Sequence, residues 1–228
     1  MGLVRTCIPA SKIEDDAYDW WKRHEEKMSW SRNNRAKAIF FGDSITHFWS
    51  KEDGIDYGEG SWDEFFAGKG VLNMGYGCDR IQNTLWHIES GEVDDQEPAF
   101  VVVNIGTNNF SATKNYPGDN VEDTAKGILF LTKKLHEKFP SARIVVMGLF
   151  PRGLLSAGRL EKNRQVNEIL HKTIPALPYA ELRDIFPQFL DKDGNADAQF
   201  FKKDLCHLCR KGYFVWYNAI ADLVKKYL

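Results

Sequence analysis

The sequence predicts an α/β fold of three layers (α/β/α), in which helices cover both faces of a central, mostly parallel five-stranded sheet. Short apolar runs rich in Val, Ile and Phe lack polar alternation, which is typical of strands buried on both faces. Amphipathic helical patterns separate these runs, and such alternation indicates parallel strands joined by right-handed crossovers. No internal repeat or low-complexity linker interrupts the pattern.

The apolar runs predict strands at 37–41, 70–74, 100–105, 143–149 and, less regularly, 179–183. The helical patterns cover 14–28, 79–90, 121–139, 159–172 and 211–227. The pattern at 121–139 is the strongest, because apolar residues recur there at three- or four-residue spacing. Long loops are expected at 51–61, 111–118 and 151–158. Two of them follow a strand, so we expect them to shape the binding site.

Length and composition predict one domain over residues 1–228, with a helical extension at 1–34 packed on it. The net charge of −2 and the mixed distribution of charges argue against a nucleic-acid partner. No stretch approaches the ~20 apolar residues of a membrane span. The N-terminus lacks the apolar core of a signal peptide, which favours the cytoplasm for a full-length chain and export for a trimmed one. The four cysteines favour reduced thiols over a disulfide scaffold, although two bridges stay open.

Ser44 lies in the segment Gly-Asp-Ser-Ile-Thr (42–46), directly behind the first predicted strand. The carboxyl end of a strand opens onto the binding crevice of a parallel sheet. A helix N-terminus, which we expect to begin here, favours negative charge. A nucleophile that forms an oxyanion intermediate needs both features. The alternative interpretation is that Asp43 or Ser44 only caps the helix.

Two more strand ends carry residues suited to the same chemistry. Asn-Met-Gly-Tyr-Gly (73–77) follows the second strand, and Gly-Thr-Asn-Asn (106–109) follows the third. The backbone of Gly75 and the amide of Asn108 would reach the same edge of the sheet as Ser44, as oxyanion donors must. Asp-Leu-Cys-His (204–207) precedes the last helix, and its spacing lets a carboxylate orient an imidazole base.

These four blocks resemble the GDSL or SGNH hydrolase family in order and spacing, from about residue 35 to the end. The segments DRIQNTLWHIESGE, VVVNIGTNN, MGLFPRG and EKNRQVNE are similar to one branch of it. That branch contains the catalytic subunits of platelet-activating-factor acetylhydrolase and related bacterial acetylesterases. The resemblance implies the flavodoxin-like SGNH fold and a homodimer, with no metal and no organic cofactor.

The resemblance also implies residue roles. Ser44 would be the nucleophile, His207 the general base and then acid, and Asp204 the group that orients His207. The Ser44 N–H, the Gly75 N–H and the Asn108 side chain would hold the oxyanion. Asp43, Ile45, His47 and Cys206 are expected around the substrate pocket. Cys206 stands where that branch often has leucine, so we expect it to line the acyl side, and Cys78 stands where another glycine is common.

Other residues could in principle compete for these roles. His47 shares a helix face with Ser44, but no carboxylate is obviously placed to orient it, so we expect a wall residue. The other histidines lie in helical patterns and are expected at the surface or its boundary: His24, His87, His136 and His171. Half a zinc site at 206–209 and a calcium-like loop at 191–202 both lack required ligands. Gly75 and Gly77 alone are poor evidence for a dinucleotide site.

The sequence therefore predicts a serine esterase for short acyl esters, with an O-acetylated carbohydrate as the expected substrate. An acetyl- or lysophospholipid is the alternative substrate. A non-catalytic binding subunit that retains the fold is the alternative from another class. A serine-directed phosphonate distinguishes the two classes, because only the enzyme would be labelled at Ser44.

Overall fold

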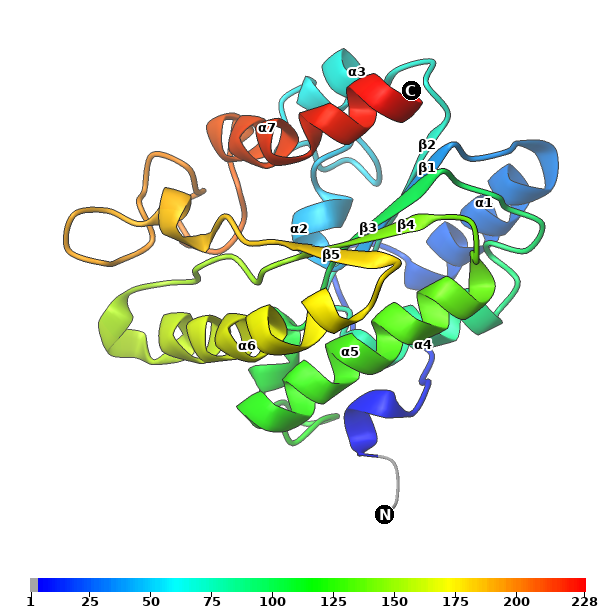
Figure 1. Cartoon of the computed structure of the whole chain (residues 1–228). Coiled ribbons are helices and arrows are strands. Elements are labelled where there is room, and N and C mark those ends of the chain that lie inside the picture. Colours follow the sequence, from blue (N-terminus) through cyan, green and yellow to red (C-terminus); the bar gives the residue numbers. More distant parts are fainter. Residues whose placement is uncertain (1–3) are drawn as a thin grey trace.

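A computed structural model describes residues 4–228 and confirms the three-layer architecture (Figure 1). All five strands are parallel, in the order β2-β1-β3-β4-β5. The strands are β1 Ala38–Gly42, β2 Val71–Gly75, β3 Phe100–Asn104, β4 Arg143–Met147 and β5 Ala180–Arg183. Each lies within two residues of its expected bounds, because continuous apolar runs and their glycine or polar boundaries mark buried strands clearly.

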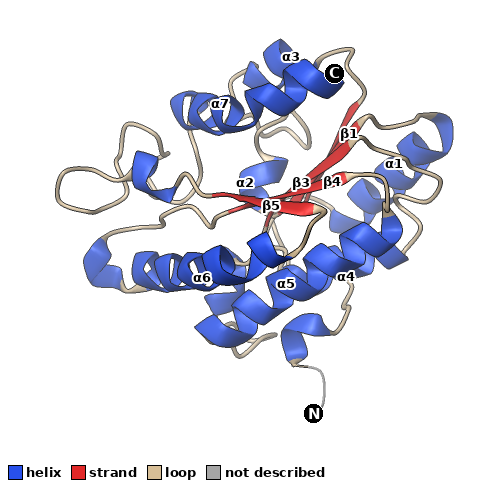
Figure 2. Cartoon of the chain, in the orientation of Figure 1, coloured by secondary structure: helices blue, strands red, loops and turns tan. Residues whose placement is uncertain are grey.

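Helices cover both faces of the sheet, as Figure 2 shows. Helices α3 and α7 lie on one face, and α1, α4, α5 and α6 lie on the other. The helices are α1 Trp20–Asn33, α2 Ser44–His47, α3 Ser61–Phe66, α4 Ile81–Glu89, α5 Val121–Lys138, α6 Arg159–Thr173 and α7 Arg210–Tyr227. No helix in the described part of the chain is both long and apolar enough to cross a bilayer.

The first long helix differs from its expected range of 14–28. It begins at Trp20 because the Asp19 side chain accepts hydrogen bonds from the N–H groups of Trp21 and Lys22. It then continues to Asn33. Its inner face carries charged side chains, Arg23 and Lys27, which are buried. An apolar periodicity therefore could not mark the true bounds of this helix.

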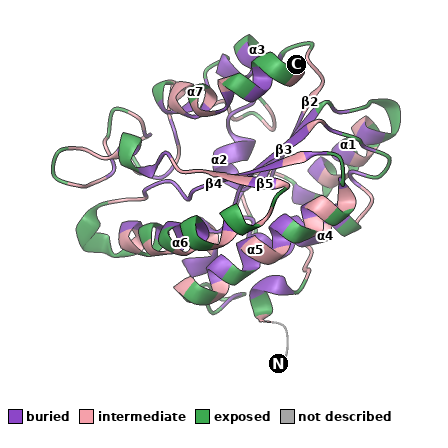
Figure 3. Cartoon of the chain, viewed as in Figure 1, coloured by how far each residue is buried: buried purple, intermediate pink, exposed green. Residues whose placement is uncertain are grey.

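Two hydrophobic clusters hold the layers together, and the strands divide their side chains between them. In β1, Ile39 and Phe41 face the cluster under α4 and α5, whereas Ala38 and Phe40 face the cluster under α3 and α7. Every residue of β1 is buried, and Figure 3 shows the buried layer running through the sheet. This two-sided burial explains why the strands contain few polar residues.

The order of the strands reverses at β1, and the carboxyl ends of the strands at such a switch point are where parallel sheets bind ligands. Gly42 at the end of β1 lies opposite Gly75 of β2 and Asn104 of β3. The segments that follow these three strands therefore begin at one level and share one edge. Those segments are α2, the loop after β2, and the 3-10 helix Thr107–Phe110.

Candidate active site

Ser44, His207 and Asp204 form a continuous hydrogen-bonded chain. The Ser44 Oγ lies 2.8 Å from His207 Nε2, and His207 Nδ1 lies 2.6 Å from Asp204 Oδ2. A carboxylate beside Nδ1 keeps the proton on that nitrogen, so Nε2 is free to accept from the hydroxyl. The structure thus brings Ser44 into contact with a turn, residues 204–207, that lies at least 160 positions later in the sequence.

The turn that carries Asp204 and His207 is closed by the same carboxylate. Asp204 Oδ1 accepts hydrogen bonds of 3.0 Å from the N–H groups of Cys206 and His207. Leu205 between them has φ of 50°, a left-handed conformation that this tight turn imposes. Partial burial raises the pKa of Asp204, but its hydrogen bonds with His207 and the backbone outweigh burial and hold that pKa below its usual value. Asp204 therefore stays ionised beside the imidazole.

Ser44 occupies the first position of α2, two residues after the end of β1. Asp43 caps this helix, because its Oδ1 accepts from the Ile45 N–H at 2.9 Å. Gly42 lets the turn pack tightly: a Cβ there would lie 2.0 Å from Thr46 Oγ1 and 2.5 Å from the Asn104 carbonyl. Burial raises the pKa of Asp43 to about 7.

The amide of Asn108 is held at both ends. Its Nδ2 donates to the Asp79 carbonyl at 3.1 Å, and its Oδ1 accepts from Arg152 Nη1 at 3.1 Å. The amide nitrogen has two hydrogens. One is bound to Asp79; no group of residues 4–228 accepts the second, which is available to an oxygen outside the protein.

The backbone N–H of Gly75 is engaged within the chain. That N–H donates to Asn73 Oδ1 at 2.8 Å. The glycine is needed instead for close approach, since a Cβ there would lie 2.2 Å from the His47 backbone nitrogen. Within residues 4–228, the Cys78 N–H three positions later has no hydrogen-bond partner. Cys78 has φ of 62°, a conformation that favours glycine, and it precedes the Asp79 carbonyl that binds Asn108.

His47 lies under the site and does have a carboxylate partner, contrary to the expectation from the sequence. The Gly77 N–H donates to its Nδ1 at 3.3 Å, so Nε2 carries the proton and donates to Asp53 Oδ2 at 2.9 Å. Burial, with the nearby charge of Arg23, lowers the pKa of His47 to about 4. Both nitrogens are used, and neither faces Ser44.

The predicted pocket residues divide into two groups. Asp43 and His47 are completely buried and engaged in the contacts above, so the expectation that they line an open pocket is wrong. Their side chains point away from solvent because α2 packs against β1 and β2. Ile45 and Cys206 are also buried, at 4% and 6% exposure, but each is adjacent in sequence to a reacting residue. Their place on the acyl side stays a prediction.

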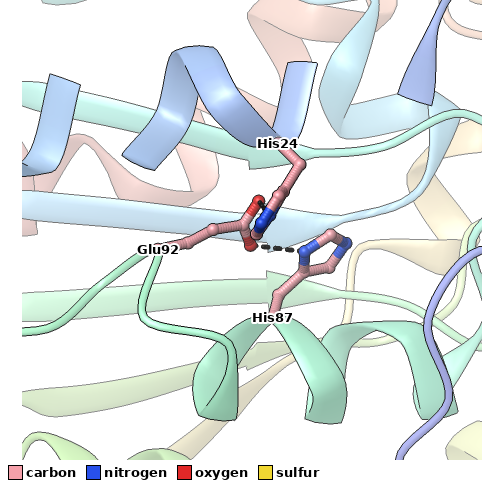
Figure 4. A group of neighbouring side chains, drawn as sticks. All are labelled: His24, His87 and Glu92. Atoms are coloured by element: carbon pink, nitrogen blue, oxygen red, sulfur yellow. Dashed lines mark hydrogen bonds and ion pairs between the residues drawn. The ribbon is translucent and has the colours of Figure 1, made fainter. Parts of the chain in front are cut away.

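A buried charged network supports Asp79 from beneath. Its carboxylate accepts from Trp20 Nε1 at 2.9 Å and from His87 Nε2 at 2.9 Å. His87 Nδ1 in turn donates to Glu92, and Glu92 also contacts His24 Nδ1 at 2.8 Å. Figure 4 shows His24 and His87 converging on Glu92. The network connects α1 and α4 to the loop that holds Asn108.

His87 is therefore no surface residue: it is 1% exposed. Ligand atoms of His24, His87 and Glu92 lie within 4.8 Å of one another, as in a metal site. Both nitrogens of His87 are already bound to carboxylates, however. We interpret the group as an ion-pair network. Burial lowers the pKa of His87, but the Glu92 and Asp79 carboxylates outweigh burial and raise it to about 9.

This pKa predicts a pH-dependent stability. Because the folded value of about 9 exceeds the ordinary value of 6.5, folded His87 holds a proton that the unfolded chain releases between these limits. Its stabilising contribution is full below pH 6.5 and is lost as the pH rises through 9. We expect the free energy of unfolding of wild type, relative to His87→Gln, to fall by on the order of 3 kcal/mol between pH 6 and pH 10. Urea unfolding at each pH measures it, and parallel curves would contradict the assignment.

A large surface hollow lies elsewhere. It has a volume of about 810 Å³, and its lining includes Phe200, Cys209 and Phe214. None of Ser44, Asn108 or His207 lines it. We place the site at Ser44 because the hydrogen-bonded groups there can carry out chemistry, whereas the hollow holds no such arrangement.

Comparison with known proteins identifies the family. The model of the GDSL-like lipase/acylhydrolase family matches residues 40–214. The chain belongs to this family. The matched range contains all four sequence blocks, from the one around Ser44 to the one that ends at His207. The human platelet-activating factor acetylhydrolase IB subunit alpha1 is 33% identical over 225 residues, which cover 96% of this chain and 91% of that protein. The chicken subunit alpha2 is 29% identical over 92% of this chain and 85% of that protein.

Solved structures of GDSL-type proteins share the fold. A GDSL-like lipase from Bacteroides thetaiotaomicron superposes with a TM-score of 0.64 at 18% identity, covering 91% of this chain and 98% of that one. An acetyl xylan esterase superposes with a TM-score of 0.59 at 18% identity, covering 82% and 98%. At these identities the similarity concerns the arrangement of the chain.

Sequence reasoning missed three features of the site. Arg152, which binds Asn108, lies in the segment MGLFPRG but had no assigned role. The sequence marks Cys78 only as a residue that stands where the resembling branch commonly has glycine. The network around His87 had no sequence signal, because a buried histidine with two carboxylate partners looks like any other helical histidine.

Proposed function

We propose that this protein is a serine hydrolase of short acyl esters that works through an acyl-serine intermediate. The observation that carries the proposal is the 2.8 Å contact between Ser44 Oγ and His207 Nε2, with Asp204 on the opposite nitrogen. A nucleophile, a base and an orienting group in this order are what covalent acyl transfer requires. Membership of a lipase and acylhydrolase family agrees with this chemistry.

The reaction would proceed in two halves. His207 Nε2 takes the Ser44 proton while Oγ attacks the ester carbonyl, which gives a tetrahedral oxyanion. Collapse breaks the bond to the alcohol, and His207 returns the proton to the leaving oxygen. A water molecule then attacks the acyl-serine with His207 as base, which releases the acid and restores Ser44. Asp204 stabilises the imidazolium in both halves.

We propose three donors for the oxyanion: the Ser44 N–H, the second Asn108 amide hydrogen, and the Cys78 N–H in place of the Gly75 N–H. The support is that the Gly75 N–H is occupied by Asn73, whereas the Cys78 N–H has no partner within residues 4–228. A crystal structure of a phosphonate adduct tests this. The phosphoryl oxygen should lie near 3 Å from the nitrogen of Cys78. A contact to the nitrogen of Gly75, with Asn73 displaced, would restore the first assignment.

Asn108→Ala should lower kcat by about 10²–10³-fold with a small effect on KM, because this donor acts mainly on the charge that develops in the transition state. Steady-state kinetics with 4-nitrophenyl acetate measure the split. Asn115→Ala, an exposed amide on a loop, is the control and should keep wild-type rates. A rise in KM at unchanged kcat would instead assign Asn108 to substrate binding.

For the substrate we propose an acetyl ester, with an O-acetylated carbohydrate first. The proposal takes Ile45 and Cys206, which are buried and adjacent in sequence to Ser44 and His207, as the side chains that limit the length of the acyl group. The acetyl xylan esterase with the same fold is consistent with a carbohydrate. An acetylated phospholipid is the second candidate, since the relatives are named as platelet-activating factor acetylhydrolase subunits.

A panel of acetylated sugars, acetylated lipids and longer acyl esters tests the substrate, with a fluorophosphonate as a probe of Ser44. Labelling of wild type but not of Ser44→Ala, with acetyl release above longer acyl release, supports the proposal. Activity confined to long chains would overturn the acetyl assignment. A folded protein that stays unlabelled and inactive would be a binding subunit.

A further inference from the structure

We propose that Arg152 and Arg159 form an anion-binding subsite beside Ser44, so that the enzyme prefers acetyl esters whose leaving alcohol carries a negative charge. This inference rests on the ester hydrolysis proposed above and adds the chemical class of the alcohol. Arg152 lies in the segment between β4 and α6, and Arg159 is the first residue of α6. The carboxyl ends of the strands, where Ser44 lies, face the same segment.

Among residues 4–228, neither arginine has a carboxylate partner. Within the described chain, no Asp or Glu oxygen lies within 4.0 Å of Arg152 or Arg159, although both side chains are only partly exposed. Arg164, one turn further along α6, is paired with Glu161 and Glu168. A guanidinium group that has lost part of its hydration without gaining a counter-charge favours an anion from outside the chain.

Hydrogen bonds place both arginines against the oxyanion side of the site. Arg152 Nη1 donates to Asn108 Oδ1 at 3.1 Å. Arg159 Nη1 donates to the Thr107 carbonyl at 2.8 Å and to Ser111 Oγ at 3.2 Å. Each contact uses one of the three guanidinium nitrogens, so donors remain on both side chains. The structure therefore holds two fixed cations with further N–H groups, both bound to the 107–111 segment that carries Asn108.

The positive charges of the two arginines repel each other. Burial and the positive charge of Arg152 lower the pKa of Arg159. The buried acid Asp43 interacts electrostatically with Arg152, which acts to lower the pKa of Asp43. Asp43 is wholly buried with a pKa of about 7, so it offers only partial compensation, and Asp204 is engaged with His207. An anion between Arg152 and Arg159 would relieve this repulsion.

The negative charge must lie on the leaving alcohol, because an acetyl group is itself uncharged. Carboxylates and phosphates both match the planar guanidinium fork. The alcohol could thus be an acidic sugar or a phosphorylated group, and these share one recognition chemistry. Substrates with each kind of charge separate the two sources.

The test compares esters that differ in the charge of the leaving group: 4-acetoxybenzoate, its methyl ester, and 4-acetoxyphenyl phosphate. The measured quantity is kcat/KM for a charged ester divided by kcat/KM for the neutral one, which cancels general effects on catalysis. We expect Arg159→Gln to lower this ratio about 5- to 10-fold, Arg159→Lys to restore part of it, and Arg164→Gln to leave it unchanged. The charged ester with the larger ratio identifies carboxylate or phosphate as the preferred anion.

Equal losses for charged and neutral esters in Arg159→Gln would overturn the proposal, because the arginine would then only support the Thr107 segment. Arg152→Gln should lower both rates through Asn108 and lower the ratio as well. Calorimetric titration with 4-hydroxybenzoate provides a readout that needs no turnover. Weaker binding to Arg159→Gln than to wild type supports the subsite even if no ester is hydrolysed. Equal binding contradicts the subsite while leaving ester hydrolysis standing.

Discussion

Ser44→Ala is expected to lower kcat for acetyl ester hydrolysis by about 10⁵–10⁶-fold, as loss of the nucleophile does in serine hydrolases. The Ser44 Oγ has one side-chain partner, His207 Nε2. Removing the hydroxyl therefore deletes the covalent step and leaves the packing of α2 intact, because Asp43 still caps this helix. Rates with 4-nitrophenyl acetate, measured beside a thermal melt, separate loss of chemistry from loss of folding.

Ser29→Ala, an exposed serine on α1, is the matched control and should keep both the rate and the melting temperature. Fluorophosphonate labelling, located by mass spectrometry, gives a second readout. Persistence of wild-type hydrolysis in Ser44→Ala, or a label on another residue, would show that the chemistry occurs elsewhere and would remove the basis of the proposed function.

Asp204→Asn has the second-largest expected effect, a decrease in kcat of about 10⁴-fold, if the behaviour of serine proteases transfers. The asparagine carbonyl can still accept from the N–H groups of Cys206 and His207, so the turn is preserved. Its amide hydrogen would be directed at His207 Nδ1 and would move the imidazole proton to Nε2. That nitrogen could then no longer accept the proton of Ser44.

The size of the decrease also depends on solvent, since the Asp204 side chain is 46% exposed. His171→Gln is the control, because it breaks another Asp–His pair, that of His171 with Asp184 on the surface. It should leave kcat unchanged. A decrease of less than tenfold in Asp204→Asn, with the fold intact, would show that His207 is oriented by something other than this carboxylate.

The stability of the site depends on residues that do not touch a substrate. Asp79 connects the network of His87, Glu92 and Trp20 to the amide of Asn108. The network is buried, so its charges interact strongly. The loss of one partner leaves the charge of another uncompensated. We expect the position of Asn108, and with it kcat, to be sensitive to changes in this network.

Part of this fold can be predicted from local sequence patterns alone. The apolar runs predict the strands to within two residues, because a strand buried on both faces must be apolar wherever it occurs. The order of strands and helices predicts the parallel sheet, and the parallel sheet predicts that Ser44 and Asn108 share an edge. Apolar patterns do not predict the bounds of α1, because this helix starts at the Asp19 cap and carries the charged Arg23 on its inner face.

The sequence by itself determined the fold class, the family and the identity of the residues that meet at the cleft, because these follow from local pattern and chain order. Only the tertiary structure decided which polar groups are free. Asn73 accepts the hydrogen bond of the Gly75 N–H, Asp53 accepts that of His47, and within the described part of the chain Arg152 and Arg159 have no acid partner. A donor is available only when no distant segment has already bound it, and such pairings depend on distances across the folded chain.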